Sequence, residues 1–510
     1  MHPLAAFACG LSLAAAAATQ EPRPAPFFLH VVDAATGRGV PLVELTTVHE
    51  VVFVTDSAGV AAIDEPELEG REVWFGVQSH GYRAPADGFG FAGVRARVVR
   101  GTSRRVELAR EQVAERLYRV TGAGIYRDSV LVGRGAPIEA PLGAGSVFGQ
   151  DSVVDVVYRG RVFWFWGDTD RPSHPLGNFA VSGATSRLPG DGGLDPAVGV
   201  DLSYFVGDDG FSRPMCPIEG PGPVWIDGLC VLAHDGLEVM LCHYARMQDL
   251  GTRHEHGLAR WHDATERFEK VAALPLDERR HPLGHPVRAE LDGEPWLVFG
   301  RPFPMLRVRP RLDDVLDPAR YEAFTCLREG ARFDAAAPAL ARDGDGALVW
   351  AWRRDTDPIA PDEWAGLVEA GHVARGEGRW DLVDVETGAP IRVHGGSIAW
   401  NAFRGRWIAF VLELFGRSAL GEVFYVESDA VTGPWRNARR VVTHDRYSFY
   451  NVRHHPWADQ DGGRYVFFEG TYTKTFSDAE RATPRYDYNQ VMYRLDLADE
   501  RLAAARGDDR

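Results

Sequence analysis

Acidic and polar side chains recur at one position of a repeated strand pattern. Asp151, Glu219, His285, His394 and Asn451 each stand just before, or at the start of, a run that predicts a β-strand. Paired carboxylates are the groups that cleave glycosidic bonds, since one protonates the leaving oxygen and the other activates water or attacks carbon. Histidine and asparagine side chains can bind sugar hydroxyls. These residue types therefore predict a carbohydrate site, provided that the fold gathers them.

Six predicted β-hairpins between residues 146 and 500 would position these side chains. Each hairpin joins an apolar run to an aromatic-rich strand through a Gly-containing turn. The turns are Arg159-Gly160, Asp235-Gly236, Asp292-Gly293, Asp345-Gly346, Arg404-Gly405 and Asp461-Gly462. A hairpin cannot bury its own faces, so regular repetition indicates units that pack against each other, and a β-propeller is the closure that fits. Six hairpin units predict six blades, or five if one hairpin is an insertion.

The composition agrees with an all-β protein. The chain has 55 Gly, 32 Pro and 11% aromatic residues among its 510 residues, which favours turns and strands over helices. Two short helices are nevertheless expected, at 108–118 and 361–370. Because the first strand of each propeller blade starts near the central axis, the polar residues that precede these strands are predicted to converge on one pocket.

Residues 27–109 read as a separate small antiparallel β-sandwich, because short alternating runs are cut by turns about every ten residues. This segment resembles the carboxypeptidase-regulatory-like module in Gly37-Arg38-Gly39-Val40-Pro41 and in Thr55-Asp56 to Gly59. The resemblance implies an accessory domain. Residues 110–145 are then a linker and lead-in, and 146–500 the propeller, which either catalyses or binds.

Short stretches of the predicted propeller resemble the β-propeller glycosidases of glycoside hydrolase family 43 and the fructan hydrolases, a superfamily with five blades. The resemblance implies that Asp151 is the base or nucleophile and that Glu219, in Glu219-Gly220-Pro221, is the general acid. The stretch FWGDT is also similar to D-arabinan-degrading propellers. Asp168, in that stretch, is interpreted as an orienting third carboxylate, with a turn-capping role as the alternative.

Further residues are candidates for the same chemistry. Glu469, within an apolar strand, is an alternative to Glu219 as the general acid, unless its role is structural and Arg485 or Lys474 pairs with it. Glu413 is a further alternative of the same kind. Sugar-contacting types are dense near the C-terminus. The predicted substrate-binding residues are Trp166, His394, Asn451, Tyr472, Arg485 and Tyr486.

The histidines give a weaker indication of a metal. No cofactor is required for the predicted reaction, but the resemblance implies an axial ion, commonly a structural Ca²⁺, for which His285 and His394 are the candidates. His254 and His256 read better as part of an exposed polar loop, and no Cys/His cluster has the spacing of a zinc site.

The net charge limits which partners are plausible, and the N-terminal sequence indicates the cellular compartment. The net charge of −16 argues against a nucleic-acid partner, which is itself a polyanion. Residues 1–19 have the form of a signal peptide, which predicts a secreted or periplasmic protein, and no later run is apolar enough to span a membrane. Beyond the signal, four cysteines allow three pairings; a Cys230–Cys242 bridge and buried free thiols are both compatible with the sequence.

Three functions fit these observations. The leading prediction is an exported glycoside hydrolase that acts on a polysaccharide or oligosaccharide. The first alternative is a non-catalytic propeller that binds glycan or protein at the cell surface, because a fold alone does not imply an activity. The second alternative is a metal-dependent propeller lactonase or lyase, in which histidines would form the active centre.

Overall fold

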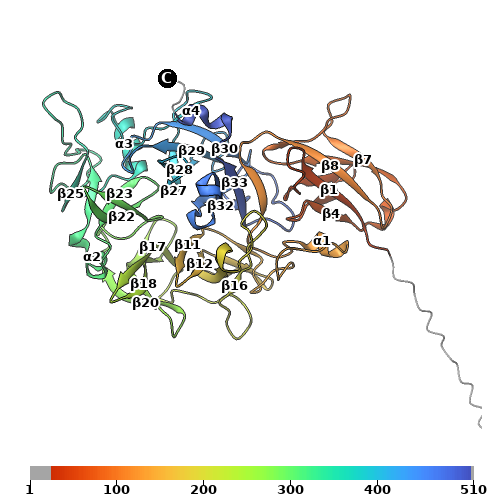
Figure 1. Ribbon diagram of the computed structural model, residues 1–510, viewed down its shortest axis with the longest axis horizontal. Coiled ribbons are helices and arrows are strands. Elements are labelled where there is room, and N and C mark those ends of the chain that lie inside the picture. Colours follow the sequence, from red (N-terminus) through yellow and green to blue (C-terminus); the bar gives the residue numbers. More distant parts are fainter. Residues whose placement is uncertain (1–23, 507–510) are drawn as a thin grey trace, which may run out of the picture.

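The computed structural model describes residues 24–506, so the predicted signal peptide at 1–19 lies outside the described range. The described chain is almost entirely β, with few and short helices (Figure 1). The α-helices are α1 (Arg127–Leu131), α2 (Leu312–Leu316), α3 (Pro361–Glu369) and α4 (Ala503–Arg506), and the 3₁₀ turns are η1 (Pro66–Leu68), η2 (Pro189–Asp191), η3 (Pro318–Arg320), η4 (Pro456–Ala458), η5 (Asp461–Gly463) and η6 (Glu500–Leu502). Within residues 24–506, no helix has the length and apolarity to cross a membrane.

Five sheets of four or five strands follow one another around the left-hand part of the molecule (Figure 1). The first is β11 (Val154–Tyr158), β12 (Arg161–Trp166), β15 (Ser182–Arg187) and β16 (Ser203–Tyr204). The second is β17 (Val224–His234), β18 (Leu237–Met247), β19 (Arg253–His262) and β20 (Arg267–Leu274). The third is β21 (Val287–Leu291), β22 (Glu294–Gly300), β23 (Pro304–Val308), β24 (Glu322–Thr325) and β25 (Ala351–Arg354).

The last two sheets complete this part. In spatial order, the fourth is β26 (Val383–Asp384), β30 (Asn437–Thr443), β29 (Glu422–Ser428), β28 (Arg406–Glu413) and β27 (Val393–Asn401). The fifth is β31 (Ser448–His454), β32 (Tyr465–Thr473), β33 (Asn489–Asp496) and β9 (Glu115–Arg119). A small extra sheet of β10 (Gly149–Gln150), β13 (Thr169–Arg171) and β14 (His174–Asn178) extends from the first hairpin.

Local turn chemistry forms three of the hairpins as the sequence predicts. The two-residue turns at 159–160, 235–236 and 292–293 have positive φ at both positions, which matches the right-handed twist of the flanking strands. The Asp345-Gly346 unit differs, because it forms no sheet of its own. Its second strand, β25, pairs with β24 as the outermost strand of the third sheet.

The helix expected at 108–118 is wrong, because this stretch is the end of β8 (Ser103–Arg110) followed by β9. All five residues of β9 are buried, and the strand pairs with β33, with Tyr118 opposite Met492. A long-range partner thus overrides the local helical preference. The pairing joins a strand from before the first sheet to the last sheet. The helix expected at 361–370 is confirmed as α3.

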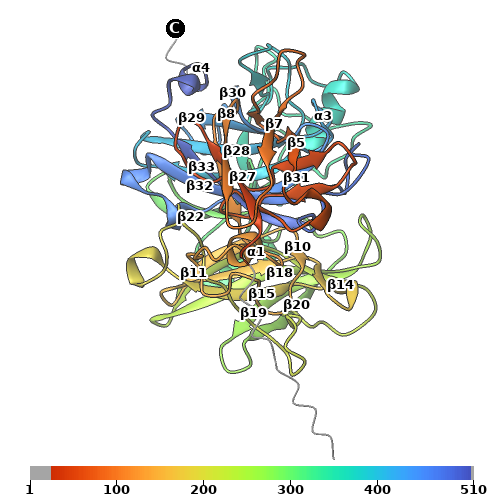
Figure 2. The ribbon, with the colours of Figure 1, turned by 90° about the vertical axis from the view of Figure 1, so that its right-hand side faces the viewer.

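Residues 27–110 form two four-stranded sheets that share one apolar cluster. One sheet is β4 (Val60–Ile63), β1 (Phe27–Asp33), β8 and β6 (Tyr82–Arg83), and the other is β3 (Val52–Val54), β2 (Glu44–Thr47), β5 (Glu72–Gln78) and β7 (Gly93–Arg97). In Figure 2 these strands lie in front of β32 and β33. Leu42 and Val54 pack into the cluster that contains Phe449 and Tyr472 of the fifth sheet, so the two parts share a continuous apolar contact.

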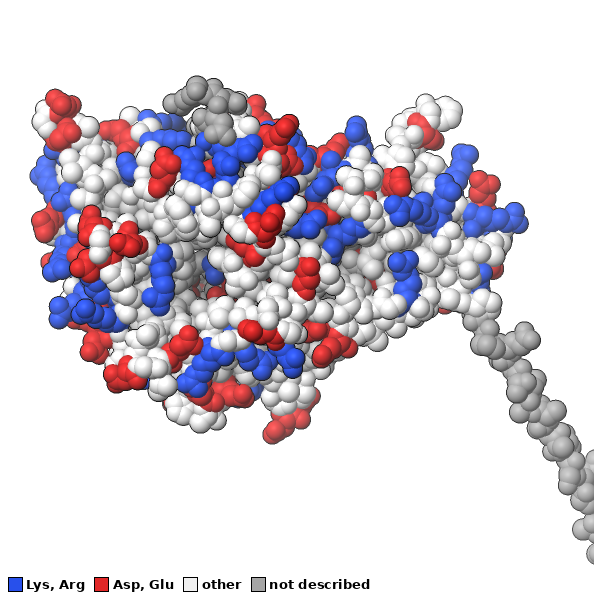
Figure 3. All heavy atoms as spheres, in the orientation of Figure 1, with Lys and Arg blue, Asp and Glu red and all other residues white. Residues whose placement is uncertain are grey.

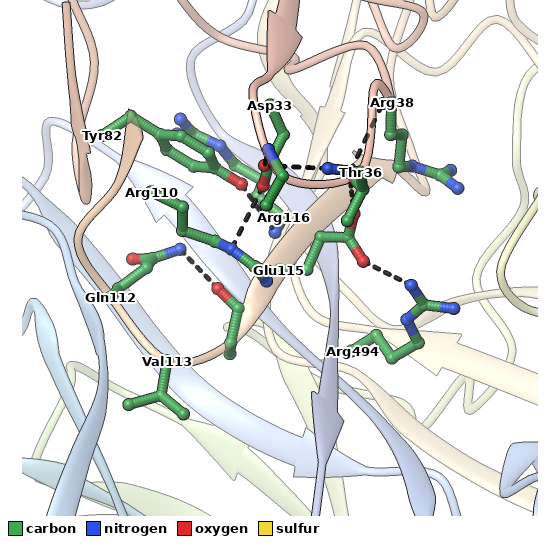
Figure 4. Close-up of polar contacts among 12 residues, drawn as sticks. Asp33, Thr36, Arg38, Tyr82, Arg110, Gln112, Val113, Glu115, Arg116 and Arg494 are labelled. Atoms are coloured by element: carbon green, nitrogen blue, oxygen red, sulfur yellow. Dashed lines mark hydrogen bonds and ion pairs between the residues drawn. The ribbon is translucent and has the colours of Figure 1, made fainter. Parts of the chain in front are cut away.

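Glu115 of β9 connects the two parts with polar contacts (Figure 4). Its carboxylate accepts a hydrogen bond from Thr36 Oγ1 at 2.8 Å and pairs with Arg494 Nη2 of β33 at 2.5 Å. Asp33, near Thr36, pairs with Arg110 at 3.1 Å. The strand that completes the fifth sheet therefore also holds the N-terminal sheets against it.

Candidate active site

A cavity of about 940 Å³ lies where the five sheets meet. Residues at or just before the first strand of every sheet line it. These include Ser152 and Val154, Trp225 and Asp227, Leu283 and His285, Val393 and His394, and Asn451 and Val452. Of the polar residues that the sequence places before successive strands, His285, His394 and Asn451 line the cavity, whereas Asp151 and Glu219 are not among its lining residues.

Asp151 and Asp168 lie on the two arms of the first hairpin, at its open end. Val154 pairs with Phe165 on one side of them, and Gln150 pairs with Thr169 on the other, and the ladder is interrupted in between. The backbone N–H of Gly167 also donates to the Asp151 carbonyl at 2.8 Å.

Gly167 leaves room for the Asp151 side chain. A Cβ atom at this position would lie 2.3 Å from Asp151 Oδ1, which is closer than a real contact allows. The requirement is one of space, so any larger residue at 167 would move the carboxylate.

The environment of the two carboxylates favours their protonated forms. Burial raises the pKa of Asp151 to about 6; the charge of Asp168 adds to the rise, and the hydrogen bond that Tyr450 Oη donates at 2.7 Å opposes it. Burial also raises the pKa of Asp168, against the Trp225 Nε1–H that donates to it at 3.1 Å. Both side chains are half-buried, so they are neither sealed in the core nor fully solvated.

Residues next to Asp151 are held in an unusual backbone conformation. Ser152 and Asn451 both have φ of +54°, which is uncommon for residues other than glycine. Asn451 Nδ2 donates to Ser152 Oγ at 2.5 Å, and the Ser152 N–H donates to Thr471 Oγ1 at 3.0 Å. Both strained residues line the cavity. Backbone strain of this kind is concentrated at functional sites, because the surrounding structure must enforce it.

A buried charge network lies behind this wall. Asp155 Oδ1 pairs with Arg453 Nε at 2.6 Å, and Asp155 Oδ2 lies 3.2 Å from His455 Nδ1 and accepts from Trp457 Nε1 at 2.7 Å. Burial alone would lower the pKa of His455, but Asp155 and Glu469 outweigh it and raise the value to about 9. The network fixes β11, which follows Ser152, against β31, which contains Asn451.

Glu469 belongs to this network. Its carboxylate is fully buried and lies 3.7 Å from His455 Nε2, and burial raises its pKa. Glu469 does not line the cavity. The buried partner of its carboxylate is His455, and not Arg485 or Lys474 as the sequence suggested. Glu413, at the end of β28, has its pKa raised to about 7, by burial first and then by Glu422.

Glu219 lies apart from the aspartate pair. It is exposed in the loop before β17, and among the described residues it is not one that lines the cavity. Asp151 and Asp168 are not lining residues either, but their neighbours Ser152 and Trp225 are, and Trp225 donates to Asp168.

The predicted substrate-binding residues divide into two groups. Asn451 and His394 line the cavity. The aromatic side chains of Trp166, Tyr472 and Tyr486 are each only 1% exposed. Trp166 stacks on Trp164, Tyr472 stacks on Tyr447, and Tyr486 lies under the Arg119 guanidinium. Arg485 is exposed. Aromatic residues near the site thus serve mainly as core.

The two histidines proposed from the sequence as metal ligands both line the cavity. Burial lowers the pKa of His285 to about 3, and burial together with Arg301 lowers that of His394. Among the described residues, the histidines that gather as a possible set of metal ligands are different ones, His243, His256 and His281. His256 is buried within β19 and not in an exposed loop.

Several cavity residues are absent from the sequence prediction. The cavity is lined by four arginines and two aspartates, namely Arg253, Arg279, Arg301, Arg392, Asp227 and Asp362. Arg301 pairs with Asp227, and Arg279 pairs with Glu363 at 2.7 Å. Arg253 begins β19, and the other three arginines lie in connections between strands, where no pattern in the sequence marks them. On the outer face in Figure 3, by contrast, acidic and basic side chains are interspersed.

The four cysteines after the signal are free and buried. The two around the Asp235-Gly236 turn are out of register, since Cys230 lies opposite Leu241. Burial raises the pKa of Cys230 to about 12, so the thiol behaves as a small apolar group.

No family model and no curated protein matches this chain. Among solved structures, a putative hydrolase from Bacteroides ovatus is 12% identical over 69% of this chain and 86% of its own, with a TM-score of 0.38. An exo-1,5-α-L-arabinanase from a bovine ruminal metagenomic library is 12% identical over 68% and 93%, with a TM-score of 0.33. The α-L-arabinanase of Cellvibrio cellulosa in complex with arabinohexaose is 11% identical over 69% and 92%, with a TM-score of 0.35. We therefore infer the function from the geometry of the site alone.

Proposed function

We propose that the protein is a glycoside hydrolase that cleaves a polysaccharide or oligosaccharide with Asp151 and Asp168 as its carboxylate pair. One observation carries the proposal: two half-buried carboxylates on the two arms of one hairpin act on each other's charge beside residues that line a cavity of about 940 Å³, and the pKa of one is raised to about 6. Acid/base cleavage needs one carboxyl group that keeps a proton and a second that is ionised, and the mutual repulsion of two neighbouring carboxylates favours sharing a single proton.

The environment distributes the roles within the pair. With a pKa of about 6, Asp151 is protonated in mildly acidic solution and can donate a proton to the glycosidic oxygen. Asp168 then acts as the ionised partner that activates water or attacks the sugar carbon. Trp225 holds Asp168 through its indole N–H and lines the cavity, so it connects this carboxylate to the substrate side. Glu219, the acid implied by resemblance, becomes the third position to test.

The proposal includes an interpretation of the fold. The five consecutive sheets are the blades of a five-bladed propeller, with β9 completing the last blade, and the two N-terminal sheets are a β-sandwich with an accessory role. The Asp345-Gly346 hairpin is the insertion. The signal-like sequence at 1–19 supports a secreted or periplasmic location.

The test is to incubate the purified protein with a panel of plant, algal and microbial polysaccharides and to measure new reducing ends. Removal of an acid or base typically costs 10²–10⁴-fold in rate, so we expect losses of about this size in Asp151→Asn and Asp168→Asn. Asp345→Asn, in an exposed turn, is the matched control. Full activity in both site variants would refute the assignment. A loss confined to Glu219→Gln would return the acid role to that residue.

The same panel separates the alternatives. Retention of a glycan without new reducing ends, in the wild type and in Asp151→Asn alike, would indicate a non-catalytic binding propeller. Activity that disappears with a chelator and is indifferent to both aspartates would indicate a metal-dependent enzyme.

A further inference from the structure

Three buried histidines meet at one wall of the central cavity. His243 lies on β18, His256 on the neighbouring β19, and His281 in the segment before β21. One ring nitrogen of each lies within 4.8 Å of those of the other two. His243 and His281 stack with ring centroids 3.9 Å apart, and both line the cavity. None of the three takes part in the proposed acid/base chemistry.

Backbone carbonyls fix which nitrogen of two of these rings is free. His256 Nε2 lies 2.6 Å from the Pro275 carbonyl, and His281 Nδ1 lies 2.8 Å from the Pro282 carbonyl. A carbonyl only accepts, so each of these nitrogens carries the proton and the opposite nitrogen keeps its lone pair. Histidine ligands of metals are commonly oriented in this way, with the second N–H donated to a carbonyl or carboxylate.

The free nitrogens are close to the spacing that a tetrahedral ion requires. His243 Nε2 lies 3.0 Å from His256 Nδ1. Metal–nitrogen bonds of about 2.0–2.1 Å in tetrahedral geometry place ligand nitrogens about 3.4 Å apart. The present contact is a hydrogen bond in which His243 Nε2 donates to His256 Nδ1, so binding an ion moves the His243 proton to Nδ1, with no net change in protonation.

We propose that His243, His256 and His281 bind one divalent transition-metal ion of the zinc class in the wall of the central cavity. Three neutral imidazoles suit Zn²⁺, Co²⁺, Ni²⁺ and Cu²⁺ and do not suit Ca²⁺ or Mg²⁺, which prefer oxygen ligands. Because two of the ligands line the cavity, the ion faces whatever occupies it. The site is separate from Asp151 and Asp168 and does not depend on the glycosidase assignment.

Two arginines determine how tightly the ion binds. Arg253 Nη1 lies 3.2 Å from His256 Nδ1 and its Nη2 donates to the Leu276 carbonyl at 3.2 Å, so this guanidinium competes for the lone pair that the ion would use. Arg301 adds positive charge, although Asp227 pairs with it. Burial, together with these cations, lowers the pKa of His243. The positive charge that disfavours protonation of these rings also repels the ion.

The experiment uses the tag-free full chain after chelator treatment and dialysis. ZnCl₂ and CoCl₂ are titrated by calorimetry, and the cobalt complex is followed by its visible absorption, which reports tetrahedral nitrogen ligation. We expect one ion per chain. His281→Ala should weaken binding at least about tenfold and abolish the tetrahedral cobalt spectrum. His262→Ala, an exposed histidine on the same strand as His256, should leave both unchanged.

Arg253→Gln provides a second variant that does not remove a ligand. It takes away the competing guanidinium, so zinc affinity should rise at least about threefold, and circular dichroism should match the wild type. Zinc binding that is unchanged in both His281→Ala and Arg253→Gln would overturn the proposal, as would the absence of one-to-one binding in the wild type. Reducing-end assays on the same preparations keep this result distinct from the outcome for Asp151 and Asp168.

Discussion

Replacement of Asp151 by asparagine should change how the stability of the protein depends on pH, whatever the substrate is. The native state disfavours the ionised carboxylate, mainly through burial, and raises its pKa from the usual 3.8 to about 6. Between these values the native state binds more protons than the unfolded state, so the free energy of unfolding falls as pH rises from about 4 to about 6. Asparagine has a similar shape, still accepts a hydrogen bond from Tyr450, and carries no charge.

The magnitude follows from the size of the shift. A rise from 3.8 to about 6 corresponds to about 3 kcal/mol, because one pKa unit is equivalent to about 1.4 kcal/mol. Asp151 is half-buried, so solvent screening reduces this value, and we expect about 1–3 kcal/mol. Asp151→Asn should therefore resemble the wild type at pH 4 and be more stable than the wild type by this amount at pH 7.

Urea unfolding at pH 4, 5, 6 and 7, followed by tryptophan fluorescence, measures the difference. The comparison is made at the midpoint of the same transition, with Asp345→Asn in an exposed turn as the control. A stability difference that is flat between pH 4 and 7, or one that favours the wild type as pH rises, would show that Asp151 is not held in a disfavoured charged state. The acid role proposed for it would then lose its physical basis.

Three further perturbations test neighbouring parts of the site. Tyr450→Phe removes a hydrogen bond to a charged group worth about 1.5–3 kcal/mol, so the pKa of Asp151 should rise by about 1–2 units and the corresponding limb of the pH–activity profile should move up with it; an unmoved limb contradicts this. Gly167→Ala places a Cβ 2.3 Å from Asp151 Oδ1 and should lower kcat at least about tenfold, whereas Gly190→Ala, which has no neighbour within 4 Å, should not; equal rates in the two variants exclude the steric argument. Asp155→Asn leaves Arg453 and His455 buried without an anion and should lower the free energy of unfolding by about 3–5 kcal/mol in urea at pH 7. A decrease below about 1 kcal/mol would mean that these ion pairs do not stabilise the fold.

Local sequence was sufficient to predict the hairpins. Asp-Gly and Arg-Gly pairs favour tight turns with positive φ, and the alternating apolar runs beside them fold back in the register that the turn sets. Asp151 and Asp168 stand symmetrically about the Arg159-Gly160 turn, with 16 residues between them, so the hairpin carries both to its open end. This part of the candidate site is encoded within a single hairpin.

What the sequence could not provide is contact between hairpins. The pairing of β9 with β33 joins residues more than 350 positions apart, and it converts a segment with helical preference into a buried strand. Contact between separate segments also leaves Glu219 exposed in a loop and buries Glu469 against His455. The pattern of one sequence predicts which face of a strand is buried, but it does not identify the segment that packs on that face.

The sequence by itself determined an almost entirely β chain and several of its tight turns. Only the tertiary structure decided which polar residues share a cavity, and it brought His243, His256 and His281 together from two adjacent strands and a following segment. The physical reason is that turn geometry depends on a few adjacent dihedral angles, whereas a pocket depends on how separate sheets close against each other.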